Sequence, residues 1–210
     1  MTAAAVRPSV IRQPGAPHPE RMVSTAGVGH SFRFVLEAGL PLLEAVRRGL
    51  AAEGYVSGVV EIGALALGPF GYVMPGLPVS PANAAYYTQP FRPAGITRLS
   101  GGAMTLGLRD GAAFFHCHGL WREADGKLSG GHILPEEAIV AEPAEVTALG
   151  IARARFEAAQ DDEINFKVFG PLTNAATPPA AATGRVVAVR LRPNQDFHAA
   201  VEAIAARHGV

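Results

Sequence analysis

FFHCHGLWREADGKLSGGH, residues 114–132, is a strand–turn–strand pattern in which two apolar stretches flank a turn signal. The turn falls at Asp125-Gly126, a dipeptide that is typical of hairpins. Segments 96–111 and 132–159 have the apolar patterns of further strands. Residues 40–55 contain apolar side chains near helical spacing and predict one helix. One helix and many strands indicate an α+β fold and not a parallel βαβ array.

The three histidines of this stretch form the candidate site. Side chains at i and i+2 of a strand share a face, so His116 and His118 are predicted to lie side by side while Cys117 points away. The hairpin brings His132 alongside, and the two glycines before it allow close backbone approach. Three imidazoles with one open coordination position are typical of catalytic zinc, although imidazole also suits iron, nickel and copper. Alternatively, each histidine is an ordinary hydrogen-bonded residue.

Two carboxylates are candidates for acid–base chemistry or for supporting the metal ligands. They are Glu61, in VVEIGAL, and Glu145, in AEPAEVTAL. A metal-bound histidine usually donates its second N–H to a carboxylate or carbonyl group, which is the reason to single them out. The alternative is that both glutamates simply face solvent. Cys117 is predicted to be a small buried hydrophobe and not a nucleophile.

The composition excludes several classes of protein. The 210 residues are 49% hydrophobic and 17% charged, which suits one domain with appendages and excludes a wholly disordered chain. Eighteen basic residues balance eighteen acidic ones, which disfavours DNA binding because phosphate neutralisation dominates such affinity. A single cysteine excludes an intramolecular disulfide framework and fits a reducing compartment. No apolar stretch approaches the roughly 20 residues that span a bilayer, so we expect a cytoplasmic protein without membrane association.

Four segments are predicted along the chain. Residues 1–30 are a leader rich in Ala, Pro, Gly and Arg, and residues 31–170 are the folded domain. Residues 171–184 are a linker by composition, and residues 185–210 are a further strand and helix. Inside the domain, residues 68–95 are dense in proline and glycine, and so long an excursion is more often functional than a plain connector.

The C-terminal segment repeats the start of the domain. Residues 187–210 align without gaps to residues 32–55, with the identical pairs Leu36/Leu191, Ala45/Ala200, Val46/Val201, Ala51/Ala206 and Gly54/Gly209. This pattern predicts the opening strand and helix of a second copy of the domain, although any strand–helix pair has a similar pattern. A strand and a helix cannot close a core alone. We therefore expect docking on the first domain, on another protomer or on a second chain that completes the copy; a truncated product is a further alternative.

Four stretches carry a resemblance to a known family: residues 32–65, ITRLSGGAMTL, FFHCHGLWREADGKLSGGHIL and AEPAEVTALG. From about Arg33 to about Phe169 the chain resembles the PPC (plants and prokaryotes conserved) domain family. Members typically show a His-x-His strand, a glycine turn, a Gly-Gly-His and a following strand with a glutamate. Here these fall on His116, His118, Gly130, Gly131, His132 and Glu145.

The resemblance implies a largely antiparallel sheet with one main helix, a homotrimer, and a metal held by the three histidines near a subunit interface. Plant members join this domain to AT-hooks that bind A·T-rich DNA. This chain has no Arg-Gly-Arg-Pro core, so that DNA-binding part is missing. DNA binding by stand-alone members is an analogy from fold and not from a site. The 68–95 excursion and the C-terminal half-repeat depart from the family pattern; we expect the first to shape a pocket and the second to alter or replace the trimer.

These observations lead us to expect a metal-dependent enzyme or a small-molecule binder, in which the three histidines hold a divalent transition metal, zinc in the simplest case. The candidates for gripping an anionic or polar ligand are Tyr72, Tyr86 and Arg98, with Tyr87 and Arg92 beside them. Hydrolysis, hydration, lyase and oxygen chemistry fit the pattern equally well. One alternative is a DNA-associated regulatory or oligomerisation module without an AT-hook. Another is a structural protein completed by a second polypeptide.

Overall fold

The computed structural model describes residues 11–210, so the first ten residues of the predicted leader lie outside the described part of the chain. The described residues form an eleven-stranded sheet, a separate two-stranded sheet, two α-helices and one short 3-10 helix. All but one of the strand pairs within these residues are antiparallel. The α+β fold with a largely antiparallel sheet and one main helix is therefore confirmed.

The elements run in the following order along the chain. The first half comprises β1 (Met22–Leu36), α1 (Leu42–Ala52), β2 (Gly58–Ile62), β3 (Leu65–Leu67), β4 (Tyr72–Val73), β5 (Pro75–Gly76), β6 (Tyr86–Tyr87) and β7 (Thr97–Arg109). The second half comprises β8 (Ala112–Arg122), β9 (Leu128–Ile133), η1 (Pro135–Glu137), β10 (Ala144–Ala152), β11 (Ala154–Asp161), β12 (Phe166–Thr173), β13 (Gly184–Leu191) and α2 (Phe197–His208). The large sheet has the order β13-β1-β10-β2-β7-β8-β9-β4, while β3 and β11 also pair with β7, and β12 pairs with β11.

The main helix α1 covers one face of the central strands, and this face holds the core. Its buried side chains recur at helical spacing: Leu42, Ala45, Val46 and Leu50. The strands beneath it contribute buried side chains of alternating residues, among them Val60, Met104, Cys117 and Val146. Burial raises the pKa of the Cys117 thiol to about 12. Cys117 is thus an inert apolar filler, as the strand alternation predicts.

Strand β1 is longer than the sequence pattern indicates. It begins at Met22, ten residues before the predicted start at Phe32, inside the segment that the composition assigns to a leader. Its second half pairs with β10, and its first half, up to Gly29, pairs with β13. The C-terminal strand β13 supplies the backbone hydrogen-bond partners of residues 22–29. Because β13 is more than 150 residues away in the sequence, the composition of residues 22–29 alone does not predict this strand.

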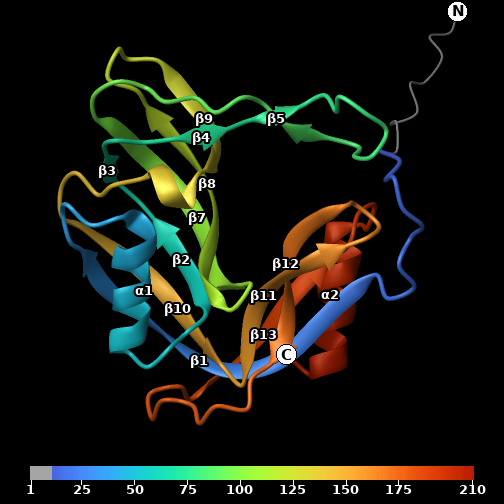
Figure 1. Ribbon diagram of the computed structural model, residues 1–210. Coiled ribbons are helices and arrows are strands. Elements are labelled where there is room, and N and C mark those ends of the chain that lie inside the picture. The colour runs from blue at the N-terminus through green and yellow to red at the C-terminus, as the bar shows by residue number, and fades with distance from the viewer. Residues whose placement is uncertain (1–10) are drawn as a thin grey trace, which may run out of the picture.

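The predicted half-repeat docks on the first domain through β13. Helix α2 begins at Phe197, the residue aligned with Leu42 at the start of α1. The Asp196 carboxylate caps it by accepting a 2.8 Å hydrogen bond from the Ala199 N–H. Helix α2 packs beside β13 and β1, on the far side of the molecule from α1 (Figure 1). Whether the segment is the start of a second copy stays a prediction.

Buried ion pairs attach the C-terminal segment to the turn that joins β11 to β12. Asp161, at the end of β11, binds Arg190 and Arg192, which lie on and just after β13. Glu163, in the turn, accepts hydrogen bonds of 2.7 and 3.0 Å from Arg21, which directly precedes β1. Both carboxylates are almost fully buried, so this network ties three distant parts of the chain together.

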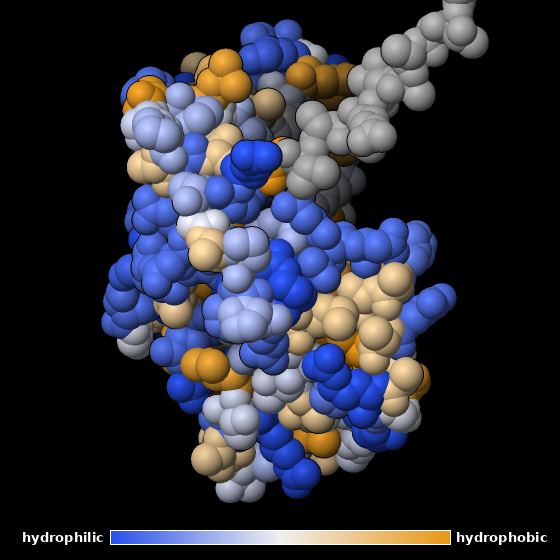
Figure 2. All heavy atoms as spheres, turned by 90° about the vertical axis from the view of Figure 1, so that its right-hand side faces the viewer, coloured by the Kyte–Doolittle hydropathy of each residue, from blue (hydrophilic) through white to orange (hydrophobic). Residues whose placement is uncertain are grey.

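Figure 2 shows the face that includes the C-terminal part of the molecule. Hydrophilic residues cover most of it, and apolar residues lie between them in smaller groups. Across residues 11–210, neither α1 nor α2 has the length and apolar character that a bilayer crossing requires.

Candidate functional site

The three histidines lie together on the face of the sheet that α1 does not cover. His116 and His118 are two residues apart on β8, and His132 on β9 is directly opposite His118. The ring centroids are 4.7 Å apart for His116–His118, 4.8 Å for His116–His132 and 5.3 Å for His118–His132. Their possible ligand nitrogens all lie within 4.8 Å of one another. The hairpin thus brings the three imidazoles to one place.

Close backbone packing next to His132 depends on glycine. A Cβ atom at Gly131 would lie 2.7 Å from the Val73 carbonyl oxygen. Such a contact does not occur between real atoms, so only glycine lets β4 approach β9 at this point. Val73 then pairs with His132, and β4 buries one side of the imidazole.

All three imidazoles are held in the neutral form at pH 7. Burial, followed by the neighbouring His116 and His118, lowers the pKa of His132 to about 4. Burial also lowers the pKa of His116, with His118 adding to the effect, and burial alone lowers that of His118. A neutral imidazole is the form that coordinates a metal, since a proton occupies the same lone pair.

The donor set fits a divalent transition metal. Three imidazoles in one cluster match zinc and its first-row neighbours, whereas calcium and magnesium prefer oxygen. The Nδ1 atom of His132 is buried and has no hydrogen-bond partner among residues 11–210. An unpartnered buried nitrogen is costly unless something else satisfies it, and a metal ion or a ligand would do so.

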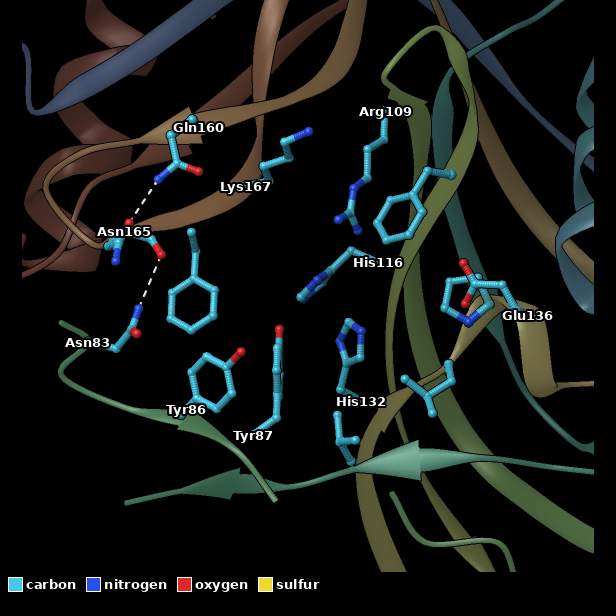
Figure 3. A pocket seen from close by; sticks show the side chains of 15 residues that line it. Asn83, Tyr86, Tyr87, Arg109, His116, His132, Glu136, Gln160, Asn165 and Lys167 are labelled. Carbon is cyan, nitrogen blue, oxygen red and sulfur yellow. Dashed lines mark hydrogen bonds between the residues drawn. The ribbon is translucent and has the colours of Figure 1, made fainter. Parts of the chain in front are cut away.

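The histidines face a cavity of about 600 Å³. Two of them, His116 and His132, lie in its wall. The other lining residues are Val73, Asn83, Tyr86, Tyr87, Arg109, Phe114, Leu134, Pro135, Glu136, Gln160, Asn165, Phe166 and Lys167. Figure 3 shows them converging from the β5–β6 sheet, from β7 and β8, and from the β11–β12 hairpin. Segments that are far apart in the sequence therefore enclose one space of a size typical of small-molecule sites.

Aromatic side chains form one wall of this cavity. The Tyr87 ring lies 5.6 Å from the His132 ring and 5.9 Å from the Phe166 ring, and Tyr86 stacks on Phe166 at 5.7 Å. Burial raises the pKa of Tyr87, against a smaller opposite effect of the Arg109 charge. The Tyr87 hydroxyl thus stays protonated at pH 7 and can donate a hydrogen bond into the cavity.

Asparagine contacts hold the β5–β6 segment against the β11–β12 turn. The Asn83 side-chain amide donates to the carbonyl of Asn165 at 3.1 Å, and the Asn165 amide donates to the carbonyl of Ala82 at 3.1 Å. Gln160 donates to the Asn165 side-chain oxygen at 3.1 Å (Figure 3). The excursion at 68–95 is therefore held against the β11–β12 turn here, and it places Tyr87 beside His132.

The ligand residues predicted from sequence are placed in different regions. Tyr86 lies in the cavity wall. Tyr72 on β4 is buried in the core and donates a hydrogen bond to Glu123 at 2.8 Å, and Arg98 pairs with Glu142 at 2.6 Å on the surface. Arg92 likewise pairs with Glu137 at 2.6 Å. None of these last three lines the cavity among the described residues.

The two predicted carboxylates lie on the histidine face but at a distance. Glu61 on β2 shares a cross-strand row with His118, with Ala103 of β7 between them, which corresponds to about 10 Å at the usual strand spacing. Glu145 lies one strand further away, on β10, and pairs with Arg33 at 3.2 Å. The carboxylate in the cavity wall is Glu136, which the sequence patterns did not single out.

Comparison with solved structures identifies the fold of this chain. No protein-family model and no curated protein matches the chain. Among solved structures, the metal-containing protein AF0104 from Archaeoglobus fulgidus has a TM-score of 0.53 at 20% identity, covering 70% of this chain and 98% of that one. A PPC protein from Pyrococcus horikoshii has a TM-score of 0.51 at 17% identity, covering 69% and 94%. A hypothetical protein from Salmonella enterica has a TM-score of 0.50 at 13% identity, covering 71% and 97%. The chain has the PPC fold.

Proposed function

We propose that this chain binds a divalent transition metal, zinc in the simplest case, and uses it to bind or convert a small molecule. His116, His118 and His132 would hold the ion. The observation that carries the proposal is the cluster of three imidazoles whose candidate ligand nitrogens lie within 4.8 Å of one another, at a cavity of about 600 Å³ whose wall includes His116 and His132. AF0104, a protein of the same fold, is described as metal-containing, which supports the proposal.

The residues around the histidines suit such a site. A bound divalent metal supplies a Lewis acid and acidifies a bound water molecule. Tyr87, beside His132, offers a hydroxyl that can donate a hydrogen bond to a ligand oxygen. Glu136, the carboxylate of the cavity wall among residues 11–210, is a candidate for accepting a proton. Glu61 and Glu145 stay candidates at a greater distance along the sheet.

The test is the metal content of tag-free protein by inductively coupled plasma mass spectrometry. We expect about one equivalent of a transition metal per chain, lost in His116→Ala and in His132→Ala. His198→Ala is the matched control, because His198 is exposed on α2 and does not line the cavity. Wild-type protein without metal, even after reconstitution with zinc, would contradict the proposal. Salt-sensitive retention on DNA would then favour the DNA-associated alternative.

We also propose that the chain forms a homotrimer through the uncovered face of the sheet. Exposed apolar side chains lie on this face with the histidines: Val35, Val59, Leu120 and Leu128. Exposed apolar groups of this kind are typical of subunit contacts. Size-exclusion chromatography with light scattering should give three times the chain mass of 21.8 kDa. A monomer at micromolar concentration would contradict this assembly.

A second polypeptide that completes the C-terminal half-repeat is a separate proposal. Phe197 and Val201 on α2 are 66% and 45% exposed, whereas the aligned Leu42 and Val46 on α1 are fully buried. A chain that supplies the missing strands would bury this side of α2. Native mass spectrometry of the purified assembly tests the idea, and a pure homo-oligomer with α2 well ordered would count against it.

A further inference from the structure

Arg109 is a cation that faces the cavity with its hydrogen-bond donors free. It is the last residue of β7, and its guanidinium lies 4.9 Å from the centre of the Phe114 ring, which fixes the group by a cation–π contact. Its side chain makes no hydrogen bond to any residue of the described chain, and its nearest carboxylate, Asp110, is 3.9 Å away. In Figure 3 the guanidinium extends toward His116.

The other cation in the cavity wall is already paired. Lys167 donates to both carboxylate oxygens of Asp110, at 2.7 and 2.8 Å. Asp110 therefore neutralises Lys167 and has little left for Arg109. Glu136 is the one carboxylate among the lining residues of the described chain. Arg109 is therefore the cation of the wall that has no hydrogen-bonded carboxylate among the described residues, and a metal ion at the histidines would add positive charge beside it.

Aromatic side chains lie beside this charge. Tyr87 stands between the rings of His132 and Phe166, and its hydroxyl points toward the side of the cavity where Arg109 and Lys167 lie (Figure 3). Aromatic faces of this kind bind planar ligand groups, and guanidinium binds carboxylate or phosphate oxygens in a two-pronged geometry.

We propose that the cavity takes a small organic oxyanion, a carboxylate or phosphate attached to a planar body, with Arg109 as the residue that selects the charge. The oxyanion lies on the Arg109 guanidinium, and the planar body lies against Tyr87 and Phe166. Lys167 contributes less, because Asp110 holds it. This assignment deepens the proposed metal function and rests on it for the position of the ligand next to the histidines, but the contact with Arg109 is independent of the ion.

The test is the affinity of the full, zinc-loaded chain for three probes, measured by isothermal titration calorimetry and saturation-transfer NMR. The probes are phenyl phosphate, benzoate and the uncharged benzyl alcohol. We expect at least one anion to bind, benzyl alcohol to bind at least tenfold more weakly, and the difference between the two anions to identify the preferred oxyanion. Equal affinity for the alcohol and both anions would overturn the proposal.

Substitutions test whether the preference for anionic probes depends on Arg109. Arg109→Gln should weaken the bound anion about tenfold or more, and Lys167→Met should have a smaller effect. Arg47→Gln is the matched control, since Arg47 is similarly exposed, at 47% against 43% for Arg109, and pairs with Glu44 on α1. Circular dichroism verifies that each variant is folded. Wild-type affinity in Arg109→Gln would overturn the proposal.

Metal content, measured on the same samples, separates this inference from the function on which it rests. Arg109→Gln should keep its zinc. If the metal is bound and neither anion binds, the inference fails and the proposed metal site stands. If no sample holds metal but an anion binds through Arg109, the metal proposal fails and the anion site stands.

Discussion

His118 and His132 lie directly opposite each other on β8 and β9, and their rings meet edge to face with centroids 5.3 Å apart. The pairing is fixed by the backbone register of the hairpin, so the two imidazoles meet without any contribution from the loops. His116 joins them because alternate residues of β8 share a face. A ligand set built on paired strands is held more firmly than one built on loops.

Metal binding should stabilise the wild-type fold. A ligand that binds only the folded chain adds about 2.7 kcal/mol at a hundredfold excess over its dissociation constant. We expect zinc to raise the thermal midpoint of wild-type protein and to leave that of His116→Ala unchanged, as measured by differential scanning fluorimetry. An equal rise in both proteins would indicate that zinc binds elsewhere.

Gly131→Ala should damage both stability and metal binding. The added Cβ would lie 2.7 Å from the Val73 carbonyl oxygen, which forces β4 away from β9. Overpacking of this kind costs about 1–3 kcal/mol, measured by urea unfolding, and we expect weaker zinc binding because His132 loses its cover. Gly63→Ala is the control, since a Cβ there meets no atom within 4 Å. Equal stability of the two variants would refute the argument.

Asn165→Ala should loosen the β5–β6 segment without disturbing the metal. The substitution removes the hydrogen bonds to Ala82 and Gln160 and costs about 1 kcal/mol for each lost bond. We expect faster backbone hydrogen exchange at residues 82–88 and weaker binding of the anionic probe, with unchanged zinc content. Loss of zinc from this variant would show that the segment supports the histidines directly.

Glu163→Gln should destabilise the chain by about 3 kcal/mol, because it leaves Arg21 with a neutral partner in a buried site. Glu142→Gln, which breaks a pair with Arg98 at the surface, should have a much smaller effect, because solvent screens exposed charges. Urea unfolding compares the two. If both variants lose a similar, small amount of unfolding free energy, the buried network contributes little to stability.

The same ion pair predicts how the free energy of unfolding depends on pH. The hydrogen bond from Arg21 lowers the pKa of Glu163 below its usual 4.5. A carboxyl group whose pKa is lower in the folded chain than in the unfolded chain stabilises the fold above pH 4.5. This stabilisation is lost as the pH falls through the pKa of the group in the folded chain. Unfolding free energy should therefore fall more steeply below pH 4.5 in wild-type protein than in Glu163→Gln. Parallel curves would exclude Glu163 as a source of the dependence.

The part of the site that is local in sequence could be predicted, and the part that depends on long-range packing could not. The histidines share one hairpin, so strand periodicity and one turn were enough to bring them together. Arg109 and Phe166 reach the cavity from the end of β7 and from β12, which meet through the pairing of β7 with β11. No short-range pattern predicts that pairing. The distance of Glu145 from the histidines likewise follows from the strand order, since β2 and β7 lie between β10 and β8.

The most direct measurement is X-ray absorption spectroscopy of the zinc-loaded protein at the metal edge. If His116, His118 and His132 bind one ion, the spectrum will show three imidazole nitrogens at about 2.0–2.1 Å, and His132→Ala will lose one of them or the ion itself. A spectrum of oxygen ligands only, or one that His132→Ala leaves unchanged, would contradict the assignment of the three histidines as a metal site.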